Sequence, residues 1–220
     1  MSSPSETQKL ASDYDVLSPL TLTFYDAWVH GFSDRFLWRC PFDELLALYR
    51  RNVSAAHLDV GVGTGLFLDR MPFPAGAAIT LMDVNAACLE TAARRIARHA
   101  PRIVRASVLA PLPAIGPFAS IGLCYLLHCL PGSIAVKAGA FDHVKAVMAP
   151  GARIFGATIV QGAVPTPWVT RRLMNFYNAK GIFSNVQDAV EDLEAELKSR
   201  FSEVDVRMRG QVALFEATCP

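Results

Sequence analysis

Short β-branched runs alternate with amphipathic helical patterns from about residue 55 onward. The apolar runs predict strands at residues 56–60, 78–83, 103–107, 119–124 and 153–159, because buried parallel strands are rich in β-branched side chains. Apolar positions at helical spacing predict helices at residues 86–98 and 135–147, the second ending before Pro150-Gly151. This alternation indicates a parallel sheet with helices on its faces.

The end of the chain departs from simple alternation. Ser184 and Gln187 have the spacing of a capping box and predict a helix over residues 184–200. Two further strands are predicted at residues 203–208 and 212–217, separated by a short gap that contains Gly210. Only a hairpin fits so short a gap, because parallel strands need a crossover of about a dozen residues. One of these two strands must therefore lie antiparallel to the rest.

The 220 residues fit one domain. The expected fold is an α/β, Rossmann-like, doubly wound seven-stranded sheet with an antiparallel C-terminal hairpin strand. Residues 1–54 are rich in aromatic side chains at helical spacing and are interpreted as an N-terminal helical cap over the carboxyl edge of the sheet. Residues 55–220 form the α/β core, with a lid insertion near residues 162–183.

Composition narrows the possible partners. The chain is 52% hydrophobic, and none of residues 106–136 is Asp, Glu, Lys or Arg. Prolines and glycines interrupt this uncharged run, which indicates buried strand and loop instead of a membrane span. The N-terminus lacks the pattern of a signal peptide, so we expect a cytoplasmic protein without stable membrane insertion.

The formal net charge of +1 gives no general attraction to nucleic acid. The five cysteines contain no Cys-x-x-Cys pair and are expected to be buried thiols.

A glycine-rich loop follows the first strand, in the segment His57-Leu-Asp-Val-Gly-Val-Gly-Thr-Gly65. Asp83 ends the second strand, where a carboxylate can accept hydrogen bonds from the two hydroxyls of a ribose. Together these features predict an adenosine-containing ligand. The third glycine of a dinucleotide fingerprint is replaced by Leu66, and Asp59 before the loop would repel a pyrophosphate but suits a cationic amino-acid group. Both departures disfavour NAD and ATP.

The sequence resembles the class I S-adenosylmethionine-dependent methyltransferases over about residues 55–218. The resemblance rests on four features in order: Asp59-x-Gly61-x-Gly63-x-Gly65, Met82-Asp83-Val84-Asn85, residues 149–153 and the terminal hairpin. It implies S-adenosyl-L-methionine as cofactor, with Gly61, Gly63 and Gly65 against its methionine and ribose parts. It also implies that Asp83 binds the ribose, that Val84 flanks the adenine, and that Ser107 and Val108 meet the adenine edge. Many members have Asp in place of Ser107.

The N-terminal Tyr14-Asp15 and residues 36–39 are similar to the cap of quinone C-methyltransferases. This similarity implies that Tyr14 closes over the methionine end of the cofactor.

The loop after the fourth strand carries Tyr125 and His128 and should face the transferred methyl group. His128 is the candidate general base, because its side chain titrates near neutral pH; a packed, hydrogen-bonded histidine is the alternative. Candidate acceptor-binding aromatic residues are Tyr25, Trp28, Trp168, Phe176 and Tyr177. No Asn/Asp-Pro-Pro-Tyr/Phe motif follows the fourth strand, which disfavours a nucleic-acid substrate, and the uncharged run offers no oxygen ligands for Mg²⁺.

The predicted function is metal-independent methyl transfer to an O, S, N or C atom of a small apolar or aromatic metabolite. One alternative is a non-catalytic cofactor-binding or regulatory protein of the same fold. Another is an NAD-dependent oxidoreductase. The oligomeric state is left open by the sequence.

Overall fold

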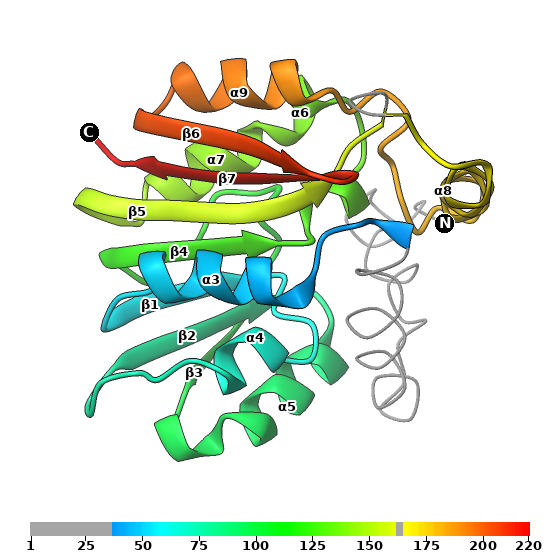
Figure 1. Cartoon of the computed structure of the whole chain (residues 1–220). Coiled ribbons are helices and arrows are strands. Elements are labelled where there is room, and N and C mark those ends of the chain that lie inside the picture. The colour runs from blue at the N-terminus through cyan, green and yellow to red at the C-terminus, as the bar shows by residue number, and fades with distance from the viewer. Residues whose placement is uncertain (1–36, 162–164) are drawn as a thin grey trace, which may run out of the picture.

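In the computed structural model, which describes residues 37–161 and 165–220, the strands form a seven-stranded sheet in the order β3-β2-β1-β4-β5-β7-β6 (Figure 1). The strands are β1 (Ala56–Val60), β2 (Ala78–Asp83), β3 (Arg102–Arg105), β4 (Phe118–Cys124), β5 (Met148–Ile159), β6 (Ser202–Arg209) and β7 (Val212–Thr218). The order reverses between β1 and β4, and ligands of such sheets bind beyond the carboxyl ends of the strands at this point.

The terminal hairpin is confirmed. β7 runs antiparallel to both β5 and β6, and Arg209 pairs with Val212 at the turn end of the hairpin. The pairs from β3 through β5 are all parallel. The predicted Rossmann-like α/β sheet with an antiparallel C-terminal strand is therefore correct.

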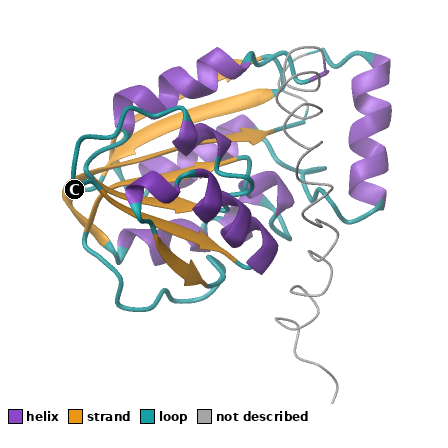
Figure 2. Cartoon of the chain, turned by 90° about the horizontal axis from the view of Figure 1, so that it is seen from below, coloured by secondary structure: helices purple, strands orange, loops and turns teal. Residues whose placement is uncertain are grey.

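Helices cover both faces of the sheet (Figure 1). One face carries α3 (Phe42–Asn52), α4 (Leu66–Asp69) and α5 (Ala86–Arg95), and the other carries α6 (Ile134–Lys137), α7 (Gly139–Lys145) and α9 (Val190–Lys198). Two separate clusters of buried side chains, one containing Leu48 and Phe155 and the other Phe141 and Ile154, fill these two layers. Helix α8 (Trp168–Ala179) lies beyond the end of the sheet (Figures 1 and 2), and its Met174 joins the buried cluster that contains Leu48.

The described part of the expected N-terminal cap lies at a different place from the one predicted. Residues 42–52 form α3, which lies on a face of the sheet and not over its carboxyl edge. The reason is the apolar stripe of this helix: Leu45, Leu48 and Tyr49 are fully buried, and the Tyr49 ring meets Phe155 of β5 edge-on, with 5.0 Å between ring centroids. Residues 1–36 lie outside the described residues.

Several element boundaries also differ from the sequence-based prediction. Helix α5 ends at Arg95, and the short 3-10 turn Ala97–His99 continues to the loop. The single helix expected at residues 135–147 is divided into α6 and α7 beside Gly139, a residue with weak helix propensity. Strand β3 ends at Arg105, so Ser107 lies in the following loop. Strand β5 begins at Met148, which pairs with Phe118.

The helix predicted at residues 184–200 begins only at Val190, so the expected capping box is wrong. Residues 184–188 instead make tertiary hydrogen bonds. The Ser184 N–H donates to the carbonyl of His128 at 2.7 Å, and the Asn185 side-chain amide donates to the carbonyl of Ile159 at 2.9 Å. The segment therefore forms its hydrogen bonds with distant parts of the chain, and not with the first turn of a helix as a capping box would.

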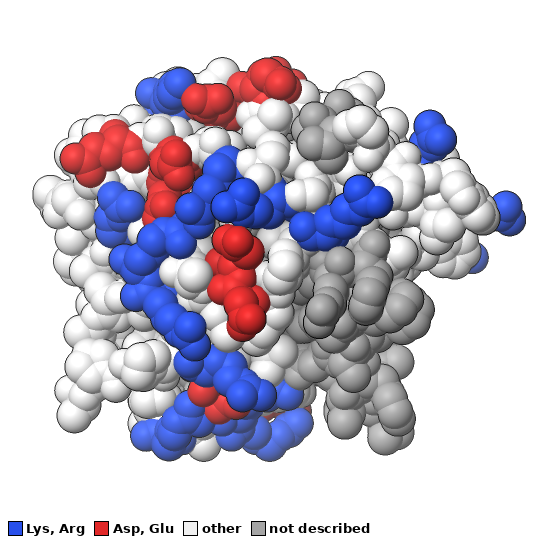
Figure 3. All heavy atoms as spheres, viewed as in Figure 1, with Lys and Arg blue, Asp and Glu red and all other residues white. Residues whose placement is uncertain are grey.

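Arginines and acidic residues intermix on the face formed by α3 and the hairpin (Figure 3). Several of them form ion pairs, such as Arg51 with Glu216 at 2.8 Å and Arg209 with Glu44 at 3.3 Å. None of the five cysteines forms a disulfide; four are buried, as expected, whereas Cys129 is only partly buried. In the described part of the chain, no helix has the length and apolar character needed to cross a membrane. No cluster of three potential metal-binding side chains occurs among the same residues.

Candidate active site

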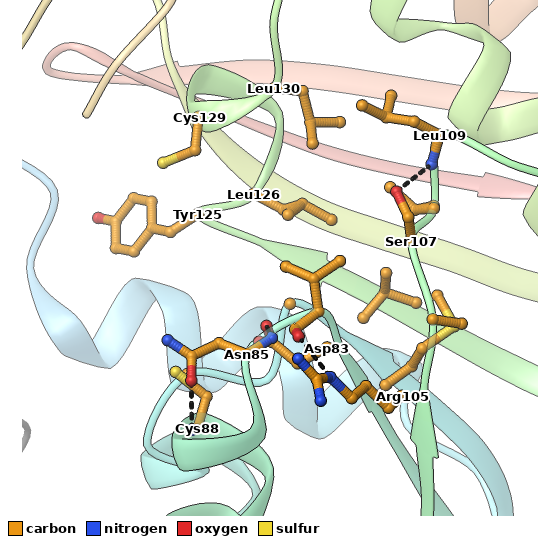
Figure 4. Close-up of a pocket in the computed structure, with 17 residues that line it drawn as sticks. Asp83, Asn85, Cys88, Arg105, Ser107, Leu109, Tyr125, Leu126, Cys129 and Leu130 are labelled. Carbon is orange, nitrogen blue, oxygen red and sulfur yellow. Dashed lines mark hydrogen bonds between the residues drawn. The ribbon is translucent and has the colours of Figure 1, made fainter. Parts of the chain in front are cut away.

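A cavity of about 350 Å³ lies beyond the carboxyl ends of β1, β2, β3 and β4 (Figure 4). Its volume falls within the usual range for small-molecule sites. The residues lining it are Val60, Gly61, Gly63, Met82, Asp83, Val84, Asn85, Cys88, Arg105, Ala106, Ser107, Val108, Leu109, Tyr125, Leu126, Cys129 and Leu130. Seven of the predicted cofactor-binding residues are therefore brought together: Gly61, Gly63, Asp83, Val84, Ser107, Val108 and Tyr125.

Asp83 supplies the carboxylate of this cavity from the last position of β2. One of its oxygens, Oδ1, accepts a hydrogen bond from the backbone N–H of Asn85 at 2.9 Å. Burial raises the pKa of Asp83, while hydrogen bonds from the backbone N–H groups of Asn85, Gly63 and Val84 oppose that rise. The neighbouring turn thus fixes the carboxyl group at the end of its strand while it faces the cavity.

Two glycines shape the loop between β1 and α4. Gly63 has φ +53°, and a Cβ built on it would meet no atom within 4 Å, so its backbone is open on that side. Gly65 has φ +73°, and a Cβ there would come within 2.9 Å of the Cβ of Ala92 in α5. Gly63 therefore leaves the room that a closely bound ligand needs, whereas Gly65 permits the loop to pack on α5 and does not line the cavity.

Asp59 lies behind the cavity wall and is not among the lining residues. Its side chain is buried, and its Oδ1 accepts a hydrogen bond from the Tyr49 hydroxyl at 3.1 Å. The pKa of Asp59 is raised to about 7, mainly by burial and also by the charge of Asp83, although the Tyr49 hydrogen bond opposes the rise. The residue predicted to contact the cofactor directly or through water is thus a buried acid that is hydrogen-bonded to Tyr49 of α3.

The loop after β3 forms an uncharged wall of the cavity. The Ser107 hydroxyl accepts a hydrogen bond from the Leu109 N–H at 3.2 Å, which leaves its own O–H available as a donor. The Val108 carbonyl accepts a hydrogen bond from Nδ1 of His143 at 2.8 Å, which ties the loop to α7. Residues of the uncharged run 106–136 therefore supply this wall and the loop after β4, as their composition suggested.

Tyr125 follows β4 with φ +56°, a left-handed conformation that is uncommon for a residue with a bulky side chain. Its N–H donates to the carbonyl of Ala157 in β5 at 2.7 Å, which fixes the backbone at the strand end. The same turn brings Leu126, Cys129 and Leu130 to the cavity. Strained backbone held in this way is common at ligand sites.

His128 does not line the cavity. Its ring is only 3% exposed, and Nδ1 lies 3.4 Å from the Ile159 N–H, which can donate to it. The ring also meets Phe183 edge-on, with 4.6 Å between centroids. Burial, together with the nearby charge of Lys137, lowers the pKa of His128 to about 3. This geometry favours the alternative reading, a packed and hydrogen-bonded histidine.

We expect His128→Asn to reduce the dependence of the free energy of unfolding on pH below about pH 7. The folded-state pKa of His128 lies below its unfolded value, so its contribution to stability is lost as pH falls from about 6.5 toward 3. Between pH 7 and pH 4.5 this loss amounts to about 2.5 kcal/mol. Urea unfolding at both pH values measures it: the variant should lose less stability than the wild type by about that amount. An equal loss in both proteins contradicts the assignment of a neutral buried ring.

The predicted acceptor-binding aromatic residues are not gathered at the cavity. Trp168 is 69% exposed and Phe176 is 52% exposed, both on α8. Tyr177 is half-buried, and its ring packs on Phe183 with 4.9 Å between centroids. The amphipathic pattern of α8 turns Thr170 and Met174 inward, which directs Trp168 and Phe176 to solvent. Tyr14, Tyr25 and Trp28 lie outside the described residues.

Sequence reasoning missed several lining residues, among them Cys88, Arg105, Leu126 and Cys129. Arg105 carries a usable signal, because it occupies the last position of β3 and pairs in register with Asp83. The other missed residues carry no such signal, because the sequence does not distinguish apolar or thiol side chains that face a cavity from those that face the core.

The fold and the cavity define a Rossmann-like protein with a small-molecule cavity at the point where strand order reverses. No family model matches the sequence. The chain is 38% identical over 198 residues to demethylluteothin O-methyltransferase of Streptomyces thioluteus, covering 89% of this chain and 86% of that protein. It is 36% identical over 224 residues to N-methyltransferase vrtF of Penicillium aethiopicum, covering 98% and 92% of the two chains.

The fold is also that of solved methyltransferases. The N-methyltransferase NodS of Bradyrhizobium japonicum, crystallised with S-adenosyl-L-homocysteine, has a TM-score of 0.61 and 17% identity, covering 91% of this chain and 97% of that chain. The chain belongs to the class I S-adenosylmethionine-dependent methyltransferases. It is an enzyme that uses S-adenosyl-L-methionine to methylate small molecules.

Proposed function

We propose that this enzyme methylates a hydroxyl or amino group of a small, uncharged, lipophilic or aromatic acceptor. The observation that carries the proposal is the uncharged character of the cavity beside the β4 loop, where Tyr125, Leu126, Cys129 and Leu130 line it. A charged acceptor would find no partner at an uncharged wall, so the free-energy cost of removing its charge from water would not be offset. The activities in the names of the O- and N-methyltransferase relatives support the choice of oxygen or nitrogen.

The residues present fit the cofactor. Asp83 offers a fixed carboxylate for the ribose hydroxyls, Gly63 leaves its backbone open to a close ligand, and Val84 and Val108 supply apolar surface for the adenine. The Ser107 O–H supplies a donor at the adenine edge, where a carboxylate is common in the family. Asp59 does not line the cavity; it accepts a hydrogen bond from the Tyr49 hydroxyl and so joins β1 to α3.

The bound cofactor supplies an electrophilic methyl group, so the chain itself contributes mainly orientation and exclusion of water. Tyr125 and the loop after β4 would hold the acceptor in line. His128 plays no part as a base here, because it lies outside the cavity with a lowered pKa. We therefore favour acceptors that need little help to lose a proton, such as phenols and aromatic amines. The predicted contributions of Tyr14 to cofactor binding and of Tyr25 and Trp28 to acceptor binding stay part of this proposal.

A panel of acceptors tests the proposal. Tritiated S-adenosyl-L-methionine is incubated with lipophilic phenols, aromatic amines, and carboxylated or quaternary-ammonium analogues of the same size. We expect transfer to the uncharged phenols or amines at least tenfold faster than to the charged analogues. Faster transfer to a charged analogue, or transfer to none of the panel by protein that still binds S-adenosyl-L-homocysteine, contradicts the proposed acceptor class.

A further inference from the structure

Arg105 is the one basic residue among the described residues that line the cavity. It ends β3 directly beside Asp83, its partner in the strand register, so both side chains arise at the same edge of the sheet. Figure 4 shows the Arg105 side chain extending toward Asp83 and Asn85. Its position therefore matches the part of the cavity that we assign to adenosine.

The guanidinium group of Arg105 is oriented by one specific contact. Its Nε donates to the carbonyl of Val84 at 3.0 Å, and Val84 is the residue assigned to flank the adenine. No ion pair of Arg105 is found within residues 37–161 and 165–220, although Asp83 is its neighbour across the strands. The group is thus held in place without its charge being neutralised by a carboxylate.

The chemistry of arginine fits this location. A guanidinium group is planar and stacks on aromatic rings, and its attraction to the ring face adds to the contact. Arg105 is exposed and lines the cavity, so its side chain lies between the cavity and solvent. An exposed arginine that only stabilised the strand ends would not need to line the cavity.

We propose that Arg105 is a cofactor-binding residue whose guanidinium plane stacks on the adenine ring of S-adenosyl-L-methionine. The bond to the Val84 carbonyl presets the orientation of the plane, and the side chain closes the adenosine end of the cavity against solvent. This inference rests on the cofactor orientation given under the proposed function, in which Val84 and Ser107 mark the adenine end. It does not depend on which acceptor the enzyme uses.

Binding measurements on three variants test this role without any acceptor. Affinities for S-adenosyl-L-homocysteine and for 5′-methylthioadenosine, which lacks the amino-acid part, are measured by titration calorimetry. We expect Arg105→Ala to weaken both ligands by the same factor, about 5- to 20-fold. Arg105→Lys should weaken them nearly as much, because an ammonium group keeps the charge and can reach the Val84 carbonyl but has no plane to stack.

Arg102→Ala is the matched control, since Arg102 is exposed on the same strand but does not line the cavity. Its affinities should equal those of the wild type, and thermal unfolding confirms that every variant is folded. Affinities of Arg105→Ala within twofold of the wild type overturn the proposal, as does full rescue by Arg105→Lys. A loss for S-adenosyl-L-homocysteine but not for 5′-methylthioadenosine also overturns it, because it places Arg105 at the amino-acid end. Failure of the acceptor panel, by contrast, leaves these affinities unaffected.

Discussion

Asp83→Ala is expected to weaken binding of S-adenosyl-L-homocysteine by about 100-fold. The carboxylate is fixed at the end of β2 by the Asn85 N–H and lines the cavity, so it can accept hydrogen bonds from both ribose hydroxyls. Hydrogen bonds to a charged group contribute about 1.5 to 3 kcal/mol each, and 1.4 kcal/mol corresponds to a tenfold change in affinity. Titration calorimetry measures the change directly.

Two further variants sharpen this experiment. Asp83→Asn keeps the shape of the side chain but loses its charge, so its affinity should fall between those of the wild type and Asp83→Ala. Asp205→Ala removes an exposed carboxylate on β6, which does not line the cavity, and should leave the affinity unchanged. If Asp83→Ala binds S-adenosyl-L-homocysteine as tightly as the wild type, the ribose contact is wrongly assigned.

Lys137→Ala should lower the free energy of unfolding by about 3 to 5 kcal/mol, because it leaves a buried carboxylate without its partner. The side chains of Lys137 and Asp188 are 1% and 0% exposed, and Nζ lies 2.5 Å from Oδ2. Lys137 also donates to the Ser184 carbonyl at 2.6 Å, so it joins α6 to the segment that precedes α9. Burial lowers the pKa of Lys137 and raises that of Asp188, and their mutual attraction opposes both shifts.

Urea unfolding at pH 7 measures this loss. The double variant Lys137→Met with Asp188→Leu removes both charges and keeps apolar volume, so it should recover most of the lost stability. Lys198→Ala is the control, because Lys198 and Glu194 form an exposed pair that contributes at most about 0.5 kcal/mol. A loss below about 1 kcal/mol for Lys137→Ala, or a double variant as unstable as the single one, contradicts the assigned role of the pair.

The sequence placed the glycine loop and Asp83 at one cavity because its signals there are local. The glycine loop and Asp83 each directly follow an apolar run, and the carboxyl ends of parallel strands meet at one edge. Gly61, Gly63 and Asp83 were thus assigned to one site before any tertiary information. The acceptor half was predicted less well: Trp168 points to solvent, and His128 lies in the core. Whether an aromatic or histidine side chain faces a cavity depends on what packs against it.

The sequence by itself determined the alternation of strands and helices and the terminal hairpin, since periodicity and gap length are properties of the chain. It also placed Gly61, Gly63 and Asp83 at one edge of the sheet. Only the tertiary structure decided the path of residues 184–188, where the His128 and Ile159 carbonyls replace the predicted helix cap. It also decided that Arg105 faces the cavity, because the carbonyl that orients this side chain lies on the neighbouring loop. Such contacts join residues distant in sequence, and no local pattern encodes them.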